Sequence, residues 1–242
     1  MTTRLFREVV ASVGFSRQRW REAVRTGNRA LQAALRDVPH AGGPGTETRQ
    51  HCRRTQRYVR CLAQATKGHP RFAAALRGDA IELMCSGARH HDIGKIGIPA
   101  SILLKPGKLT PAEYEIVKLH TSIGRDIVNS ARQLHDGPNE FLDYVWEIAY
   151  CHHEKWDGSG YPQGLSGDNI PVSARLTALA DVYDALLSRR IYKDAYSHQE
   201  AIRLIAEGRA GHFDPDLTDI FLSVAHDFFA IALIGNVDRR AV

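Results

Sequence analysis

The chain has 242 residues, of which 43% are hydrophobic and 24% are charged, so it can bury a full core without disulfides or oligomerisation. Its longest apolar runs, such as residues 228–235, are far shorter than the ~20 residues that a membrane span needs. The N-terminus also lacks a secretory apolar region. We therefore expect a soluble cytoplasmic protein without a membrane partner.

The charge is uneven along the chain. Residues 1–60 contain 13 Arg and 4 acidic residues, a balance of +9, and the overall charge is +5, so the rest of the chain carries −4. A basic arm that binds nucleic acid is one interpretation, but arginines on the outer face of a solvated helix are the simpler one. We do not expect a nucleic-acid partner.

Helical periodicity runs through most of the sequence. Apolar residues recur at helical spacing from Ser16 to Leu35, and the glycine- and proline-rich residues 41–46 interrupt the pattern. Thr46 can cap the next helix, which should end near residues 68–70. Further helices are expected from Phe72 and over residues 79–89, 111–120, 139–151, 174–189, 198–208 and 215–233. We predict an all-α helical bundle, with a basic helical segment and linker over residues 1–45 and one domain over residues 46–242.

The four cysteines form no CxxC pair. Two of them lie in apolar helical stretches, where cysteine behaves as a small buried hydrophobe. Structural packing in a reducing compartment is therefore expected.

Chemistry is indicated first by His91 and Asp92, which follow a predicted helix. A neighbouring imidazole and carboxylate can bind a pair of metal ions, and Lys95 offers a cation for a phosphate oxygen. A His-Asp pair alone is weak support, because any two-residue string occurs often by chance.

Five further features follow the same chemistry, although each has a plain structural reading. They are the Glu47 and His51 pair at i, i+4 spacing, His120 near a helix end, His152-His153 after an apolar helix, the glycine-rich residues 156–162 with Tyr161, and Asp181 in an apolar helix. A glycine-rich loop with aromatic residues lets backbone and rings approach a nucleotide. A buried carboxylate needs a partner, and a metal ion is one.

These residues give the chain a resemblance to the HD-GYP family, a branch of the HD phosphohydrolases. The match runs from about Glu47 to about Ala232 and includes residues 91–99 (HDIGKIGIP), 103–109 (LLKPGKL), 152–162 (HHEKWDGSGYP), 180–186 (ADVYDAL) and 211–215 (GHFDP). The resemblance implies a bacterial signalling phosphodiesterase that hydrolyses cyclic di-GMP to the linear dinucleotide, with GMP as a second product.

The resemblance also assigns the site. It implies two or three iron or manganese ions, with the ligands Glu47, His51, His91, Asp92, His120, His152, His153 and Asp181. Glu47 matches the extra carboxylate of members with a third metal. Lys95, Arg190 and Lys193 match phosphate contacts, and Tyr161 lies in the loop over the site, while His91, Asp92 and Lys95 serve the chemistry.

The sequence departs from the family pattern at His90, Ala100 and Ile191, none of which removes a ligand. His90 can be structural, support a ligand, or compete for metal. Residues 133–139 are expected to reshape the mouth of the site. These departures leave open another cyclic dinucleotide as substrate, or a module that binds cyclic di-GMP without turnover.

About 40 residues precede the glycine-rich linker, and we expect them to hold no receiver or sensor domain. We therefore expect either a signalling partner protein that supplies this input or a truncated gene, and leave a homodimer open.

Overall fold

A computed structural model describes residues 49–133, 137–188 and 195–237. The predicted helix over residues 16–35, the linker, Glu47, Ile191, Arg190 and Lys193 lie outside these residues. The proposed division between residues 1–45 and 46–242 therefore stays a prediction.

The described residues form helices joined by short loops. In chain order these are α4 (Arg49–Thr66), α5 (Ala80–Ala88), η1 (Ile93–Gly97), α6 (Ala100–Leu103), α7 (Pro111–Gln133), α8 (Glu140–Cys151), η2 (Gly167–Asn169), α9 (Val172–Leu187), α10 (His198–Glu207), α11 (Pro215–Ser223) and α12 (Ala225–Val237). Over this part of the chain there is no strand, only an isolated bridge between Arg209 and Phe213. The predicted all-α fold is confirmed.

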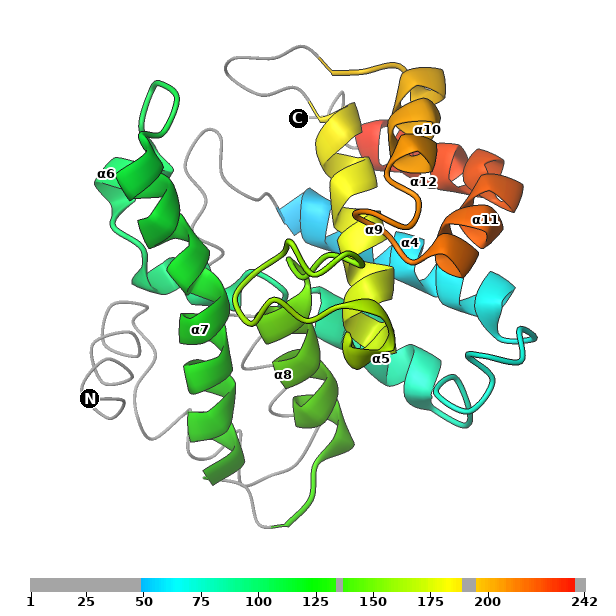
Figure 1. The fold of residues 1–242 in the computed structure, drawn as a ribbon, viewed down its shortest axis with the longest axis horizontal. Coiled ribbons are helices and arrows are strands. Elements are labelled where there is room, and N and C mark those ends of the chain that lie inside the picture. The colour runs from blue at the N-terminus through cyan, green and yellow to red at the C-terminus, as the bar shows by residue number, and fades with distance from the viewer. Residues whose placement is uncertain (1–48, 134–136, 189–194, 238–242) are drawn as a thin grey trace.

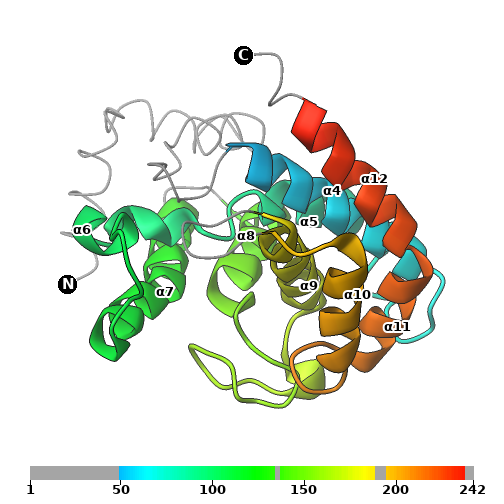
Figure 2. The same cartoon turned by 90° about the horizontal axis from the view of Figure 1, so that it is seen from above.

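The helices form two groups, one centred on α4 and the other formed by α7 and α8. Helix α4 packs against α5, α9, α11 and α12, while α7 and α8 pair with each other on the other side of the molecule (Figure 1). Seen from above, α12 lies along α4 (Figure 2). An aromatic cluster joins α4, α9 and α12, because the Tyr58 ring stacks on Phe228 at 4.8 Å and Tyr183 meets Phe228 edge-on at 5.2 Å. Such contacts fix the helices relative to one another.

Three predicted elements differ from the structure. The prediction of a helix from Phe72 is wrong, because residues 70–76 form turns rather than a helix. These turns bury Phe72 and Leu76. Helix α7 continues past His120 to Gln133, because Ile127, Val128 and Ala131 extend its buried stripe.

The helix expected over residues 215–233 is two helices, α11 and α12, with a bend of 68° between them. The break at Val224 brings Phe221 and Phe228 into edge-on contact at 5.0 Å. Both rings then pack against Tyr183. Packing around one tyrosine therefore decides the bend.

The end of α7 lies well beyond His120 along the helix. Gln133 ends α7 thirteen residues after His120, which corresponds to about 20 Å along a helix. Residues 134–136 of the connection to α8 lie outside the described residues. The prediction that residues 133–139 reshape the mouth of the site therefore stays a prediction.

No single described helix is long and apolar enough to cross a membrane. The bent pair α11 and α12 passes the same test only when its two helices are taken together.

Candidate metal centre

Seven of the eight predicted metal ligands lie in described residues, and the fold brings all seven together. His51 comes from the start of α4, His91 and Asp92 follow α5, and His120 lies in α7. His152 and His153 follow α8, and Asp181 lies in α9. One group contains Asp92, His120, His152 and His153, and a second contains His51, His91 and Asp181, with the ligand atoms of each group within 4.8 Å of one another.

The two groups adjoin each other. His91 Nε2 lies 3.4 Å from Asp92 Oδ2 and 3.8 Å from Asp181 Oδ1. His51 Nε2 lies 3.4 Å from both His91 Nε2 and Asp181 Oδ1. Asp92 therefore stands between the groups, as a carboxylate that bridges two ions would.

The backbone orients the histidines. Nδ1 contacts a main-chain carbonyl in three of them: Ala88 at 2.9 Å for His91, Val117 at 2.7 Å for His120 and Ile148 at 2.8 Å for His152. An Nδ1–H that donates to a carbonyl leaves the Nε2 lone pair for a metal. In each case Nε2 is the atom that faces the cluster.

Three polar atoms at the centre are buried without a hydrogen-bond partner: Asp92 Oδ1, His120 Nε2 and His152 Nε2. His120 Nε2 is 3.0 Å and His152 Nε2 is 3.8 Å from Asp92 Oδ1, but neither pair is aligned for a hydrogen bond. Because buried polar atoms without partners destabilise a fold, their convergence fits metal coordination. The donor set is suitable for a cation.

Burial and neighbouring charges control the protonation of these groups. Burial, with His91 as a further cause, lowers the pKa of His152 to about 3, and burial also lowers the pKa of His153 well below its usual range. Burial alone would raise the pKa of Asp92, but Lys95, His91 and His120 hold it well below the usual range. Neutral imidazoles around an ionised carboxylate are the forms that bind metal ions.

Lys95 lies beside the centre on η1. Its ammonium forms an ion pair with Asp92 Oδ2, and its side chain is only partly exposed. This places a cation next to the predicted bridging carboxylate, within reach of an anion bound there.

Asp184 and Arg54 support the centre, although the sequence analysis assigned neither of them a role. Asp184 Oδ2 lies 2.7 Å from His51 Nδ1, and the same carboxylate accepts hydrogen bonds from Arg54 Nε at 2.6 Å and Nη2 at 2.8 Å. Asp184 therefore orients His51 as the carbonyls orient the other histidines. The signal available in the sequence was its position three residues after Asp181, on the same helix face.

Glu154, which directly follows His152 and His153, holds the glycine-rich loop after α8 in place. The buried Glu154 carboxylate accepts hydrogen bonds from the backbone N–H of Gln163 at 2.7 Å and Leu165 at 3.0 Å. A side chain at Gly160 would collide with the backbone of Glu154 and Lys155. The folded loop places the Tyr161 ring on His153, with ring centroids 4.8 Å apart.

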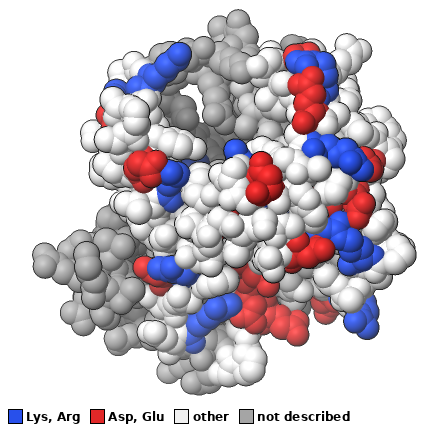
Figure 3. Space-filling model, viewed as in Figure 1, with Lys and Arg blue, Asp and Glu red and all other residues white. Residues whose placement is uncertain are grey.

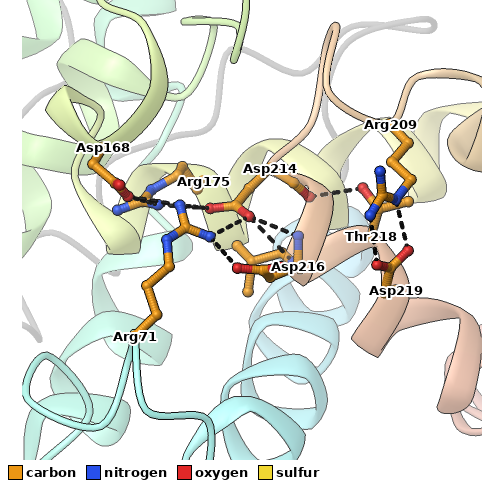
Figure 4. Close-up of polar contacts among 9 residues, drawn as sticks. Arg71, Asp168, Arg175, Arg209, Asp214, Asp216, Thr218 and Asp219 are labelled. Carbon is orange, nitrogen blue, oxygen red and sulfur yellow. Dashed lines mark hydrogen bonds and ion pairs between the residues drawn. The ribbon is translucent and has the colours of Figure 1, made fainter.

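An ion-pair network anchors the other end of this loop (Figure 4). The buried Asp214 carboxylate accepts from Arg71 at 2.9 Å and from Arg175 at 2.6 Å. Both arginines also contact Asp168 in η2, at 2.6 Å and 3.0 Å. The Arg71 guanidinium lies 4.9 Å from the Trp156 ring centroid, so the network fixes the loop at two points.

The face drawn in Figure 3 is hollowed between the part over α6 and α7 and the part over α9 and α10. Acidic and basic side chains alternate on the surrounding surface (Figure 3).

His90 lies outside both groups. It is 7% exposed, and its ring meets Phe141 edge-on at 6.2 Å. Among its predicted roles, this position favours packing. Ala100 is exposed at the start of α6, and its side chain belongs to neither group.

The cysteines follow the predicted pattern. Cys52, Cys85 and Cys151 are buried and Cys61 is half-buried, all with free thiols. Burial raises the pKa of the Cys85 and Cys151 thiols to about 12. A buried thiol that stays protonated is a poor nucleophile, so Cys85 and Cys151 serve as packing residues.

Residues 46–217 match the HD domain family. The chain belongs to this family, and the predicted HD-GYP resemblance is confirmed by the relatives and the fold. A cyclic di-GMP phosphodiesterase of Vibrio cholerae is 50% identical over 186 residues, which is 77% of this chain and 38% of that protein. A 3'3'-cGAMP-specific phosphodiesterase of the same organism is 39% identical over 76% of this chain and 33% of its own length. The chain thus spans less than half the length of either relative.

A solved structure shares the fold. Bd1817, an HDG"Y"P protein from Bdellovibrio bacteriovorus, matches with a TM-score of 0.52 and 19% identity, over 81% of this chain and 57% of that one.

Proposed function

We propose that this protein is a metal-dependent phosphodiesterase that hydrolyses cyclic di-GMP to the linear dinucleotide and then to GMP. The observation that carries the proposal is the pair of ligand groups joined at Asp92, with buried donor atoms that lack protein partners. The similarity to a cyclic di-GMP phosphodiesterase over 77% of the chain supports the substrate.

We further propose that His91, Asp92, His120, His152, His153, Asp181 and His51 hold two ions. Imidazole and carboxylate donors without thiolate suit iron or manganese better than a structural zinc. Bound ions would lower the pKa of a water molecule and stabilise charge on the phosphoryl oxygens. Glu47 stays a predicted ligand of a third ion.

The protein's own residues would bind and orient the substrate. Lys95 would neutralise a non-bridging phosphate oxygen, since its ammonium already lies at Asp92. Tyr161 would border the substrate, since its ring stacks on the candidate ligand His153. Arg190 and Lys193 stay predicted phosphate contacts.

A second candidate substrate is 3'3'-cGAMP, favoured by the 39% identity to the relative with that specificity. A module that binds without turnover is less consistent with the site, because every described ligand position keeps a metal-binding side chain. A signalling partner protein, a homodimer and a cytoplasmic location stay predictions.

The test is hydrolysis of cyclic di-GMP and 3'3'-cGAMP by protein purified without oxygen and analysed for bound metal. Asp92→Asn keeps the side-chain shape but removes the bridging charge, so we expect loss of metal and on the order of a thousandfold loss of rate. The matched control is His90→Gln, which changes the neighbouring histidine outside the ligand groups and should keep both metal and activity. Full activity of Asp92→Asn would refute the proposal.

A further inference from the structure

Beside the metal centre, two tyrosines and a lysine form a continuous surface that the coordination chemistry does not require. Tyr114 and Lys118 lie on α7 at i, i+4 spacing and therefore share one helix face. Tyr161 reaches this face from the loop after α8. The Lys118 ammonium is 5.6 Å from the Tyr114 ring centroid and 5.5 Å from the Tyr161 ring centroid. We call these three residues the Tyr-Lys-Tyr wall.

The wall is directly connected to the ligands. Tyr161 stacks on His153, and His120, two residues after Lys118, lies with its ring centroid 5.0 Å from that of His153. A nucleotide whose phosphate occupies the metal centre would therefore bring its base close to the wall. In Figures 1 and 2 the loop after α8 points toward α7.

The wall is also accessible. Tyr114 is 48% exposed, and the Lys118 side chain is 27% exposed. The ammonium forms an ion pair with Glu115 at 2.6 Å, and the Glu115 side chain is 66% exposed. An ion pair with so exposed a carboxylate contributes little, so the lysine can donate to a ligand instead.

We propose that the Tyr-Lys-Tyr wall is a base-binding site that selects guanine over adenine. Tyr114 is exposed and Tyr161 is half-buried, and accessible aromatic rings stack on any base, which supplies affinity without selectivity. The ammonium supplies the selectivity, because guanine presents the acceptors O6 and N7 on one edge, while adenine places an N6 amino donor beside N7. A phosphate needs no aromatic rings, so a base explains the surface better. This inference rests on the proposed cyclic-dinucleotide function.

The experiment compares binding of cyclic di-GMP and cyclic di-AMP to the full chain in the presence of Ca²⁺, together with steady-state hydrolysis in Mn²⁺. Lys118→Met removes the charge but keeps the length. We expect the preference for guanine to fall about tenfold, through KM rather than kcat. Lys118→Arg should restore it, since a guanidinium also donates to O6 and N7.

Lys105→Met is the matched control. Lys105 is another partly exposed lysine, paired with Glu113 in front of α7, and its loss should leave the preference unchanged. A merely structural Lys118 would not change the ratio between the two ligands. An unchanged ratio in Lys118→Met, or a wild-type chain without guanine preference, would overturn the base site.

Failure of the proposed function gives a different result. If the wild-type chain hydrolyses no cyclic dinucleotide but Lys118→Met still loses guanine-selective binding, the base site stands and the enzymatic proposal falls. If hydrolysis is present and selectivity is independent of Lys118, the enzymatic proposal stands alone.

Discussion

Some histidines of this protein are candidate metal ligands and others are packing residues. The groups that contact the two ring nitrogens decide between these roles. Where Nδ1 is occupied by a carbonyl or carboxylate, as in His51, His91, His120 and His152, Nε2 faces the centre. His90, one residue before a ligand candidate, packs on Phe141 instead. Residue type alone does not separate these roles.

His212 provides a pH test that is independent of the metal centre. It stacks on Phe213 at 4.2 Å, and burial, with Lys155 as a further cause, lowers its pKa to about 4. The unfolded chain, with a pKa near 6.5, then binds more protons than the folded chain between pH 6.5 and 4, so stability falls as pH falls through this window.

We expect His212→Gln to reduce this acid sensitivity. At pH 4.5 the histidine should account for about 2 to 3 kcal/mol of the stability lost since pH 7. Urea unfolding of both proteins in chelator at pH 7 and pH 4.5 measures the difference. Equal pH dependence of the two proteins would show that His212 is not held neutral.

At the scale of elements, close contacts between backbones position the ligands. The short helix η1 packs directly on α7, and a Cβ at Gly94 would collide with the carbonyl of His120 and the backbone N of Gly124. Glycine is needed there because of this approach rather than because of its backbone angles.

Gly94→Ala should therefore push α7, and with it His120, away from Asp92. We expect a loss of more than about 2 kcal/mol in unfolding free energy, since overpacking against backbone cannot relax easily, and a loss of bound metal. Gly68→Ala is the control, because a Cβ there meets nothing within 4 Å. Unfolding curves and metal content that match between the two variants would contradict the packing argument.

The network around Asp214 makes a second prediction about elements. Asp214 caps α11 by accepting from the Asp216 N–H at 2.9 Å, and it also neutralises Arg71 and Arg175. Asparagine still caps a helix well, so Asp214→Asn removes mainly the charge.

The buried Arg175 would then lose its closest carboxylate, and we expect destabilisation of about 3 kcal/mol. Asp219→Asn is the control because its partner Arg209 is exposed, and exposed ion pairs contribute little. Thermal and urea unfolding compare the two variants. A smaller effect at Asp214 than at Asp219 would mean that the network does not hold the loop.

At the scale of the whole molecule, the centre joins most of the fold. Its seven candidate ligands come from α4, the segment after α5, α7, the segment after α8, and α9. A metal bound there would link both groups of helices.

Metal should therefore stabilise the chain through mass action. With Mn²⁺ at a hundredfold excess over its Kd, the folded state should gain about 3 kcal/mol relative to chelator, which raises Tm by several degrees. Asp92→Asn should lose this gain. A wild-type Tm that does not respond to Mn²⁺, Fe²⁺ or chelator would exclude a resident metal centre.

The sequence alone determined the helical class, most helix positions and seven described ligand candidates, because helix periodicity and donor chemistry are local properties of the chain. It did not reveal the break at Val224 or the turns around Phe72, since both depend on packing against other helices. Only the tertiary structure decided that Asp184 orients His51, 133 positions away, and that Lys118 meets Tyr161. Contacts between residues so distant in sequence arise from how helices pack, and no local pattern records them.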